Sequence, residues 1–260
     1  MGRIFRVLRL YWRTSWAAEM EYRSNFVFAC ISSLGNLFGS CFSLWLFYRA
    51  GAGFPGWTVY EGAVVLGIFS IFTGAVAALL SPNLSRIVTH VQEGTLELLL
   101  LKPLDSQLQV SLRVFSPWGV PDVVFGSAVC GWGLAHSGAF GLRSLLFVVP
   151  FAAGLVLLYS LWFLVATTSV WFTKIYNATE VLRGLLDAGR FPMAAYPAIY
   201  RLVFTFIVPI AFLTTVPAEA LLGRATSTWM LASPAVALVA FCLARLVWRR
   251  ALRSYTGASG

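Results

Sequence analysis

Two lysines are the obvious candidates for holding a nucleotide phosphate, and neither has the surroundings that a phosphate loop requires. Lys102 follows Leu101, and Lys174 follows Thr173. In the pattern G-x-x-x-x-G-K-[ST] a glycine directly precedes the lysine, so that backbone N–H groups can surround the phosphates. We therefore expect that this chain does not hydrolyse ATP itself. The sequence also has no H-E-x-x-H, no G-x-S-x-G and no paired-carboxylate pattern, so we expect no catalytic residue and no enzyme activity.

The thiol and imidazole side chains do not form a metal-binding pattern. The cysteines stand far apart in apolar runs and include no C-x-x-C pair; they are Cys30, Cys41, Cys130 and Cys242. His90 and His136 have no second ligand at a useful spacing. Small buried thiols are the simpler interpretation. We expect no metal site and no disulfide.

Polar side chains inside the apolar runs are few, and most of them share one helix face. On a helix over residues 24–48, small and hydroxyl-bearing side chains fall within about 100° of arc. They are Ser32, Ser33, Asn36, Ser40 and Ser43, with Gly35 and Gly39 beside them as a G-x-x-x-G pair. Such residues let helices approach closely and hydrogen-bond in lipid. A helix-packing seam is the favoured interpretation, and a wall of a transport pathway is the alternative.

Asp122 is the acid nearest to the interior of an apolar run. Acids inside a membrane indicate function by default, and proton coupling is one such function. Because Pro121 precedes it, a position in the first turn of a helix at the membrane interface is an equally good interpretation.

The elements that position these side chains are membrane helices. Hydrophobic residues make up 59% of the chain and charged residues 11%, well below the quarter that is usual in soluble domains. About 20 apolar residues are enough to cross a hydrocarbon core of about 30 Å. We predict one all-α integral membrane domain over residues 1–260 with six transmembrane helices. These run over about 24–48, 60–81, 114–135, 144–172, 202–217 and 226–246. Prolines make the third and fifth of these the least regular.

The positive charges predict the topology. Sixteen of the 19 lysines and arginines fall in the terminal segments and in the second-to-third and fourth-to-fifth connections; the other three are Arg49, Arg143 and Arg224. The positive-inside rule then places both termini in the cytoplasm. The net charge of +9 could suggest nucleic acid, but no soluble basic module is left over to bind it. The arginines instead stand where lipid headgroups would be.

Two predicted segments lie on the arginine-rich side. Residues 1–20 form a basic amphipathic helix with Arg3, Arg6, Arg9 and Arg13 on one face, which is typical of a helix in the membrane interface. It is either an anchor or an elbow that a partner pushes on. Residues 86–113 form an apolar elbow of two short helices: Gly94 allows a sharp turn, Pro103 ends the first helix and Asp105 caps the second. An exposed apolar elbow needs a cover, and a partner's groove is favoured over the chain's own span ends.

Two further short helices are predicted. Residues 176–188 read as a surface helix with a solvated face. Residues 214–224 read as an outer-leaflet helix, with Pro217 at its start, Glu219 in its first turn and Gly223 as its stop.

Five segments resemble the bacterial type-2 ATP-binding cassette (ABC) exporter permeases. They are 93–104 (EGTLELLLLKPL), 189–192 (GRFP), 206–212 (FIVPIAF), 216–223 (VPAEALLG) and 252–260 (LRSYTGASG). The resemblance runs through the whole chain in order and departs from the family at the proline-bearing start of the third span.

The resemblance implies an all-α permease of the bacterial inner membrane that has no cofactor of its own. ATP and Mg²⁺ would be bound by a separate ATPase present in two copies, and a second permease would complete the pathway as a homo- or heterodimer. The residues implied to lie nearest the ATPase are Glu93, Gly94, Glu97, Lys102, Pro103 and Asp105, and those implied to cap the exit are Pro217, Glu219 and Gly223. The rival hypotheses are an ion-gradient-driven transporter or channel that works without an ATPase, and a membrane scaffold without transport.

Overall fold

The computed structural model describes residues 2–21, 23–101, 105–139, 141–172 and 178–255. Within these ranges the regular structure is helical and includes no strand, which confirms the predicted all-α class. The α-helices are α1 (Gly2–Glu19), α2 (Arg23–Arg49), α3 (Val59–Ala75), α4 (Ser81–Gln92), α5 (Leu96–Leu100), α6 (Ser106–Ser111), α7 (Val120–Ser137), α8 (Val148–Thr167), α9 (Ala178–Leu186), α10 (Ala198–Leu202), α11 (Thr215–Leu221) and α12 (Ser227–Ser254).

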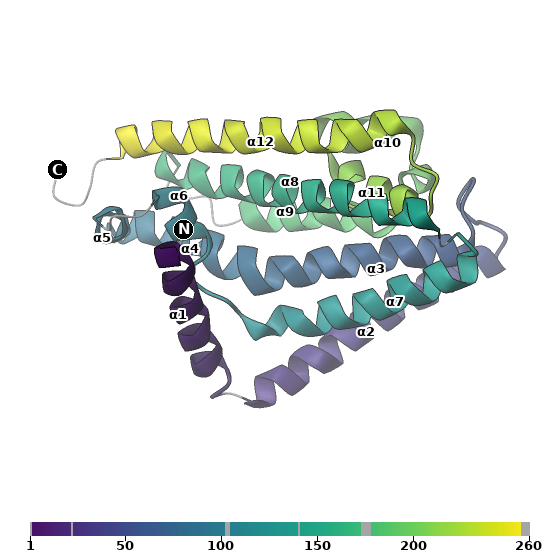
Figure 1. Ribbon diagram of the computed structural model, residues 1–260, viewed down its shortest axis with the longest axis horizontal. Coiled ribbons are helices and arrows are strands. Elements are labelled where there is room, and N and C mark those ends of the chain that lie inside the picture. The colour runs from purple at the N-terminus through teal and green to yellow at the C-terminus, as the bar shows by residue number, and fades with distance from the viewer. Residues whose placement is uncertain (1, 22, 102–104, 140, 173–177, 256–260) are drawn as a thin grey trace.

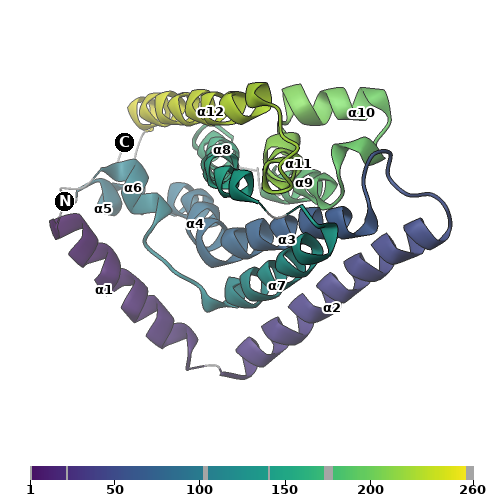
Figure 2. The same ribbon diagram turned by 45° about the vertical axis from the view of Figure 1, so that its right-hand side comes forward.

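The long helices form a bundle with two distinct ends. In Figure 1, α2, α3, α7, α8 and α12 run roughly lengthwise, and α1 crosses one end at a steep angle. That end also carries α5, α6 and the C-terminal end of α12, and we call it the termini end. The opposite end, which we call the loop end, carries α10, α11 and the loop between α2 and α3 (Figure 2).

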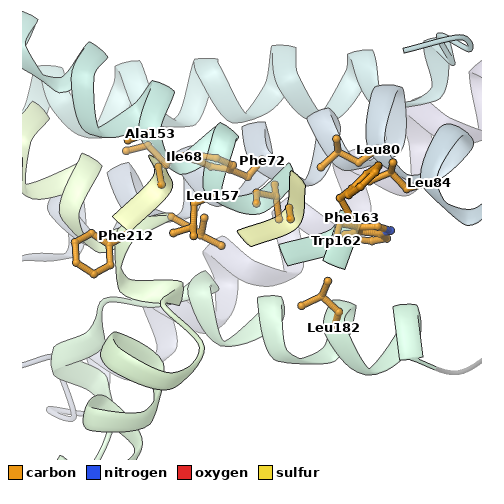
Figure 3. Packing of buried hydrophobic residues seen from close by; sticks show 14 of the residues in the cluster. Ile68, Phe72, Leu80, Leu84, Ala153, Leu157, Trp162, Phe163, Leu182 and Phe212 are labelled. Atoms are coloured by element: carbon orange, nitrogen blue, oxygen red, sulfur yellow. The ribbon is translucent and has the colours of Figure 1, made fainter. Parts of the chain in front are cut away.

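Aromatic and branched side chains from α3, α4, α8 and α9 fill the centre of the bundle (Figure 3). Trp162 and Phe163 on α8 are fully buried, as is Leu84 on α4. Leu182 on α9 belongs to the same cluster. The outer faces of α2 and α12 instead expose many large apolar side chains, as expected for helices that face lipid.

The helices α3 and α7 approach closely because glycines line their contact. A Cβ added to Gly67 on α3 would lie 2.5 Å from the backbone nitrogen of Cys130 on α7. A Cβ added to Gly126 on α7 would lie 2.8 Å from the carbonyl oxygen of Gly67. Small residues at such crossings allow the tight backbone packing that holds membrane helices together. α7, which corresponds to the third predicted span, is therefore firmly packed against the bundle.

Prolines account for two differences from the predicted boundaries. The predicted second span continues as one long helical segment, Val59–Gln92. A π-helical stretch, Val76–Leu80, lies just before Pro82, whose missing N–H interrupts the regular hydrogen bonding. The predicted third span does not begin at 114. It begins with a 3-10 turn at Pro117 followed by α7, since proline suits the first turn of a helix.

The expected continuous fifth span over 202–217 is instead a broken pair of helices. α10 and the π-helical segment Val203–Ile207 precede the break, and Ile210–Leu221 follows it at an angle of 74°. Val208 has extended backbone angles, as expected for a residue that precedes a proline. Pro209 therefore ends the helix that the apolar composition alone had predicted to continue.

The predicted surface helix over 176–188 is a helix, but it lies along the bundle; its first two residues fall outside the described ranges. The Arg183 guanidinium donates to Ser81 Oγ at 2.5 Å and stacks on the ring of Trp162. Farther along, the Phe191 ring packs on Phe54 in the loop between α2 and α3. The segment from α9 to Phe191 therefore runs from the termini end toward the loop end.

The path of this segment changes the predicted distribution of arginines between the two ends of the bundle. Arg190 is half-buried against the bundle, with its guanidinium 5.3 Å from the centre of the Phe69 ring. Arg201 lines a small cavity with Trp57 at the loop end, so it belongs with the few charges of that end. The predicted fourth-to-fifth connection is consequently not one loop on the arginine-rich side. Most of the basic residues still lie in the other three segments of that side.

Four helices in the described ranges are long and apolar enough to cross a membrane: Ser24–Arg49, Val59–Gln92, Ser144–Val170 and Ser227–Ser254. The bent pair around Pro209 makes a fifth if it is counted as one span. The multi-span membrane fold is confirmed, and the number six stays a prediction.

Candidate functional site

The turn between α4 and α5 is the sharpest feature of the termini end. Gly94 has a φ of 67°, which is in the left-handed region that side chains with a Cβ disfavour. The imidazole Nδ1 of His90 lies 2.7 Å from Thr95 Oγ1, and the backbone N–H of Thr95 donates to the carbonyl of His90. A glycine and a short polar clasp thus fix the angle between the two helices.

α5 presents an apolar and acidic surface outward. Leu96 and Leu99 are buried against the bundle, whereas Leu98 is 65% and Leu101 81% exposed. Glu93 and Glu97 are exposed beside them. The chain's own helices therefore cover one face of the predicted elbow and leave the other uncovered. Lys102 and Pro103 lie outside the described residues.

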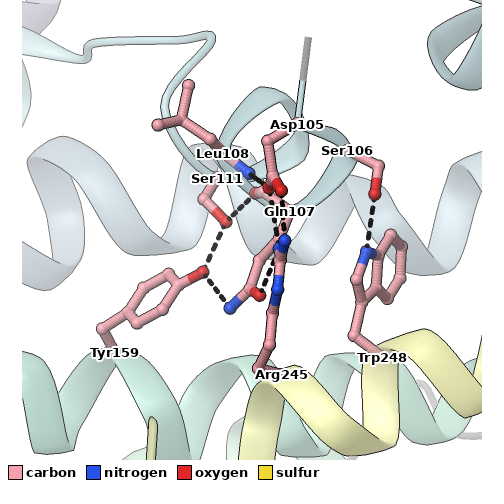
Figure 4. Close-up of polar contacts among 8 residues, drawn as sticks. All are labelled: Asp105, Ser106, Gln107, Leu108, Ser111, Tyr159, Arg245 and Trp248. Carbon is pink, nitrogen blue, oxygen red and sulfur yellow. Dashed lines mark hydrogen bonds and ion pairs between the residues drawn. The ribbon is translucent and has the colours of Figure 1, made fainter. Parts of the chain in front are cut away.

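α6 is joined to α12 by an ion pair (Figure 4). As predicted, Asp105 is the N-cap of α6, and its Oδ1 accepts from the N–H of Leu108 at 3.1 Å. The same carboxylate accepts from both terminal nitrogens of Arg245, with Nη1 at 2.8 Å from Oδ1. Two parallel bonds between a guanidinium and a carboxylate fix the relative orientation of their helices.

Further hydrogen bonds extend this connection to α8. The side chain of Gln107 accepts from Arg245 at 3.0 Å and donates to the hydroxyl of Tyr159 at 3.0 Å (Figure 4). The hydroxyls of Tyr159 and Ser111 are 2.8 Å apart. Next to this network, the indole N–H of Trp248 donates to Ser106 Oγ. The elbow is thereby tied to two long helices of the bundle.

The electrostatics of the network favour the ionised form of the Asp105 side chain. The hydrogen bond from Arg245 is the largest influence on Asp105, and it holds the pKa of this carboxyl below its usual value. The bond from the Leu108 N–H acts in the same direction, and partial burial opposes both.

Asn83 fixes the chain between α6 and α7. Its side-chain nitrogen donates to the carbonyl of Val114 at 2.7 Å, and its oxygen accepts from the N–H of Val114 at 2.8 Å. The N–H of Ser116 donates to the carbonyl of Ala78, in the π-helical stretch. These bonds explain why α6 ends at Ser111.

α1 packs on the segment that Asn83 holds. The indole N–H of Trp12 donates to the carbonyl of Leu112 at 3.0 Å, and the Trp16 ring stacks on Phe115 with centroids 5.8 Å apart. The side chains of Arg6, Arg9 and Arg13 are exposed, whereas that of Arg3 is outside the described side chains. α1 thus packs directly on the segment that follows α6. Its place in the membrane interface stays a prediction.

The polar stripe of α2 is divided between the bundle and the outside. Ser33 donates to Asp122 Oδ1 at 2.5 Å, and Ser40 accepts from Arg190 at 3.3 Å. Ser43 is partly covered, whereas Ser32, Gly35, Asn36 and Gly39 are exposed. The structure therefore brings Asp122, in the first turn of α7, together with one edge of the stripe. The other edge is uncovered in this single chain.

α11 is more deeply buried than a helix lying on an outer leaflet would be. It begins at Thr215, so Pro217 is its third residue, and Glu219 is not in its first turn. Gly223 follows the helix with a φ of 69°, as expected for a glycine that ends a helix. Glu219 lines a cavity of about 220 Å³ with Trp57 and Trp229. The predicted role of these residues as an exit cap stays a prediction.

Several residues of the termini end were not found from the sequence. Asn83, Gln107, Tyr159, Arg245 and Trp248 form bonds between positions that are between 31 and 142 residues apart. The available signal was local: Arg245 is the first charge after a long uncharged run, and Asn83 directly follows a proline within a helix. Neither signal identifies a partner.

A comparison with protein families finds a match over most of the chain. The model of a family described as ABC-2 family transporter protein matches residues 34–259. No curated protein and no solved structure shows significant similarity to the chain.

Proposed function

The chain belongs to the ABC-2 family of transporter proteins, as a membrane permease subunit, and from this membership we propose that it forms half of the pathway of an ATP-driven exporter. A separate ATPase subunit would supply the energy, bound at the elbow made by α4, α5 and α6. This chain would supply no catalytic residue.

The uncovered face of α5 is the observation that supports this proposal most. Two exposed leucines, Leu98 and Leu101, follow the exposed acids Glu93 and Glu97 in the chain, at the end of the bundle that carries the termini. A small apolar patch rimmed by charges is typical of a protein contact. Because this surface lies outside the apolar spans, the partner that would cover it is a protein of the aqueous phase.

The elbow is tied to the bundle in a way that suits transmission of movement. A push on α5 would pass to α6 and then to α12 through the Asp105–Arg245 pair and the Trp248–Ser106 bond. Closure of the ATPase on ATP would favour one of two arrangements of the long helices, as a ligand favours the state that it binds more tightly.

Assembly and orientation are part of the same proposal. The uncovered edge of the α2 stripe would pack on a second permease, of the same or a related sequence, and two ATPase copies would bind the pair. The excess of arginines at the termini end supports placing that end in the cytoplasm of a bacterial inner membrane.

The test is co-purification with an ATP-binding subunit from the native membrane. The variants Glu97→Arg, which reverses a charge on α5, and Gly94→Pro, which removes the turn, are expected to lower retention of the ATPase and its stimulation by at least about tenfold. Glu21→Arg makes the same charge reversal between α1 and α2, away from the elbow, and should bind normally. Unchanged retention in both elbow variants would overturn the assignment of the elbow.

The rival hypotheses predict different results in vesicles. A transporter driven by an ion gradient would move cargo in vesicles that contain this chain alone, and loss of the Asp122 carboxyl would stop it. A scaffold would move no cargo even with the ATPase present. The proposal requires cargo movement that depends on both the ATPase and ATP.

A further inference from the structure

A groove runs along α12 near its C-terminal end, and its lining changes from apolar to basic along its length. It has a volume of about 800 Å³. Phe241, Cys242 and Leu246 line the part nearer the middle of the bundle, and Arg249, Arg250 and Arg253 line the part at the termini end. These positions recur at helical spacing, so they share one face of α12.

The three arginines at the end of this groove have no protein partner in the described part of the chain. No hydrogen bond or ion pair joins their side chains to another described residue. All three are exposed. Asp105, an acid of the same end of the bundle, is already paired with Arg245. Three positive charges within two helical turns are therefore exposed and form no ion pair with the residues that the structure describes.

The apolar end of the groove continues into a surface that suits acyl chains. Leu238, Val239, Leu243 and Leu246 on α12 are each at least half exposed. The change from these side chains to arginines places residues 246–249 where the hydrocarbon core gives way to lipid headgroups. An acidic soluble protein would match the arginines but not the apolar end.

We propose that this groove binds an anionic phospholipid, with its phosphate held by Arg249, Arg250 and Arg253 and its acyl chains lying along Phe241, Cys242 and Leu246. Basic pockets beside membrane helices are suited to anionic headgroups, because a charge-assisted bond is added to the attraction of the surface. The site goes beyond the proposed transport function and does not depend on it.

The groove adjoins the network that holds the elbow. Arg245 and Phe241 line both this groove and a neighbouring cavity of about 550 Å³ that reaches Asp105, Gln107 and Tyr159. A lipid in the groove therefore lies next to the guanidinium that pairs with Asp105.

The experiment uses the full chain purified in detergent and titrated with phosphatidylglycerol or phosphatidylcholine, with bound lipid counted by native mass spectrometry. We expect saturable binding of phosphatidylglycerol that weakens as salt is added. The variant R249Q/R250Q/R253Q should bind it roughly 100-fold more weakly, since each arginine near an anionic surface contributes roughly a factor of five.

The matched control is R6Q/R9Q/R13Q, which removes the same charge from α1. Its affinity for phosphatidylglycerol at the groove should stay within about twofold of the original, because the groove is lined by α12 and includes no residue of α1. Three results would each overturn the proposal, because they would show only a general attraction between arginines and anionic lipid. These are an equal loss of affinity for phosphatidylglycerol in both triple variants, equal binding of phosphatidylcholine, and binding that never saturates.

A second measurement does not require the arginine variants to fold. In a variant that keeps Cys242 as its one cysteine, phosphatidylglycerol should slow the reaction of this exposed thiol with N-ethylmaleimide by at least about fivefold, whereas phosphatidylcholine should not. Equal rates with the two lipids would also overturn the proposal.

Discussion

The carboxylate of Asp105 and the guanidinium of Arg245 form a two-point ion pair between residues 140 positions apart in the sequence. The pair joins the start of a helix of six residues, α6, to one of 28 residues, α12. In this way a short element outside the apolar spans is held in register with a helix long enough to cross the membrane.

The first prediction concerns the strength of this pair. Asp105→Asn and Arg245→Gln should each lower the free energy of unfolding in detergent by about 1 kcal/mol, a modest value because the two side chains are 43% and 31% exposed. A double-mutant cycle should give a coupling energy of about 0.5–1 kcal/mol. Glu21→Gln serves as the control and should change stability by less than about 0.5 kcal/mol. A coupling energy of zero would show that the side chains of Asp105 and Arg245 do not stabilise each other.

The second prediction concerns pH. Because the pKa of Asp105 is lowered in the folded protein, its contribution is present above the unfolded value of about 3.9 and is lost as pH falls through the lower folded value. The stability difference between the original protein and Asp105→Asn should therefore be constant at neutral pH and shrink below about pH 4. Thermal unfolding at several pH values measures it, and a difference that persists at the acid end would contradict the lowered pKa.

The third prediction concerns the contact of α3 with α7. Gly67→Ala should destabilise the chain by about 2 kcal/mol or more, because its Cβ would lie 2.5 Å from a backbone nitrogen of α7. Gly131→Ala is the matched control: it lies on α7 with open space where its Cβ would stand, and it should be neutral or slightly stabilising. Equal behaviour of the two variants in thermal unfolding would show that the helices do not approach as described.

The fourth prediction concerns Asn83. Asn83→Ala should cost about 3 kcal/mol, because it leaves both the N–H and the carbonyl of Val114 buried without their side-chain partner. Asn25→Ala, at an exposed position of α2 outside the polar stripe, should cost less than about 0.5 kcal/mol. Hydrogen exchange at 112–116 should rise in the first variant alone; protection that stays unchanged would contradict the role of Asn83.

The long apolar helices could be predicted from the sequence because their signal is local. The run between Arg23 and Arg49 and the runs within α8 and α12 contain almost no charge, and helix length follows directly from the thickness of the hydrocarbon core. The cap at Asp105 and the turn at Gly94 were predictable for the same reason, since each depends on a residue type at one position.

The path of the chain after α8 could not be predicted, because it depends on contacts distant in sequence. The charges of α9 fit a solvated helix, and Glu180 and Arg183 form an ion pair there. The position of α9, however, depends on Leu182 reaching the core and on Arg183 reaching Ser81. The apolar composition around Pro209 predicts a continuous helix, but the proline disfavours helical angles at Val208, where the helix breaks.

The most direct test of the account is to isolate the chain from its native membrane in mild detergent and to measure ATP hydrolysis in the purified material. We expect an ATP-binding subunit to co-purify, and its hydrolysis of ATP to drop at least about tenfold towards the level of the free subunit when Glu97 on α5 is replaced by arginine. A chain that purifies without such a subunit and moves its cargo in vesicles without ATP would contradict the account.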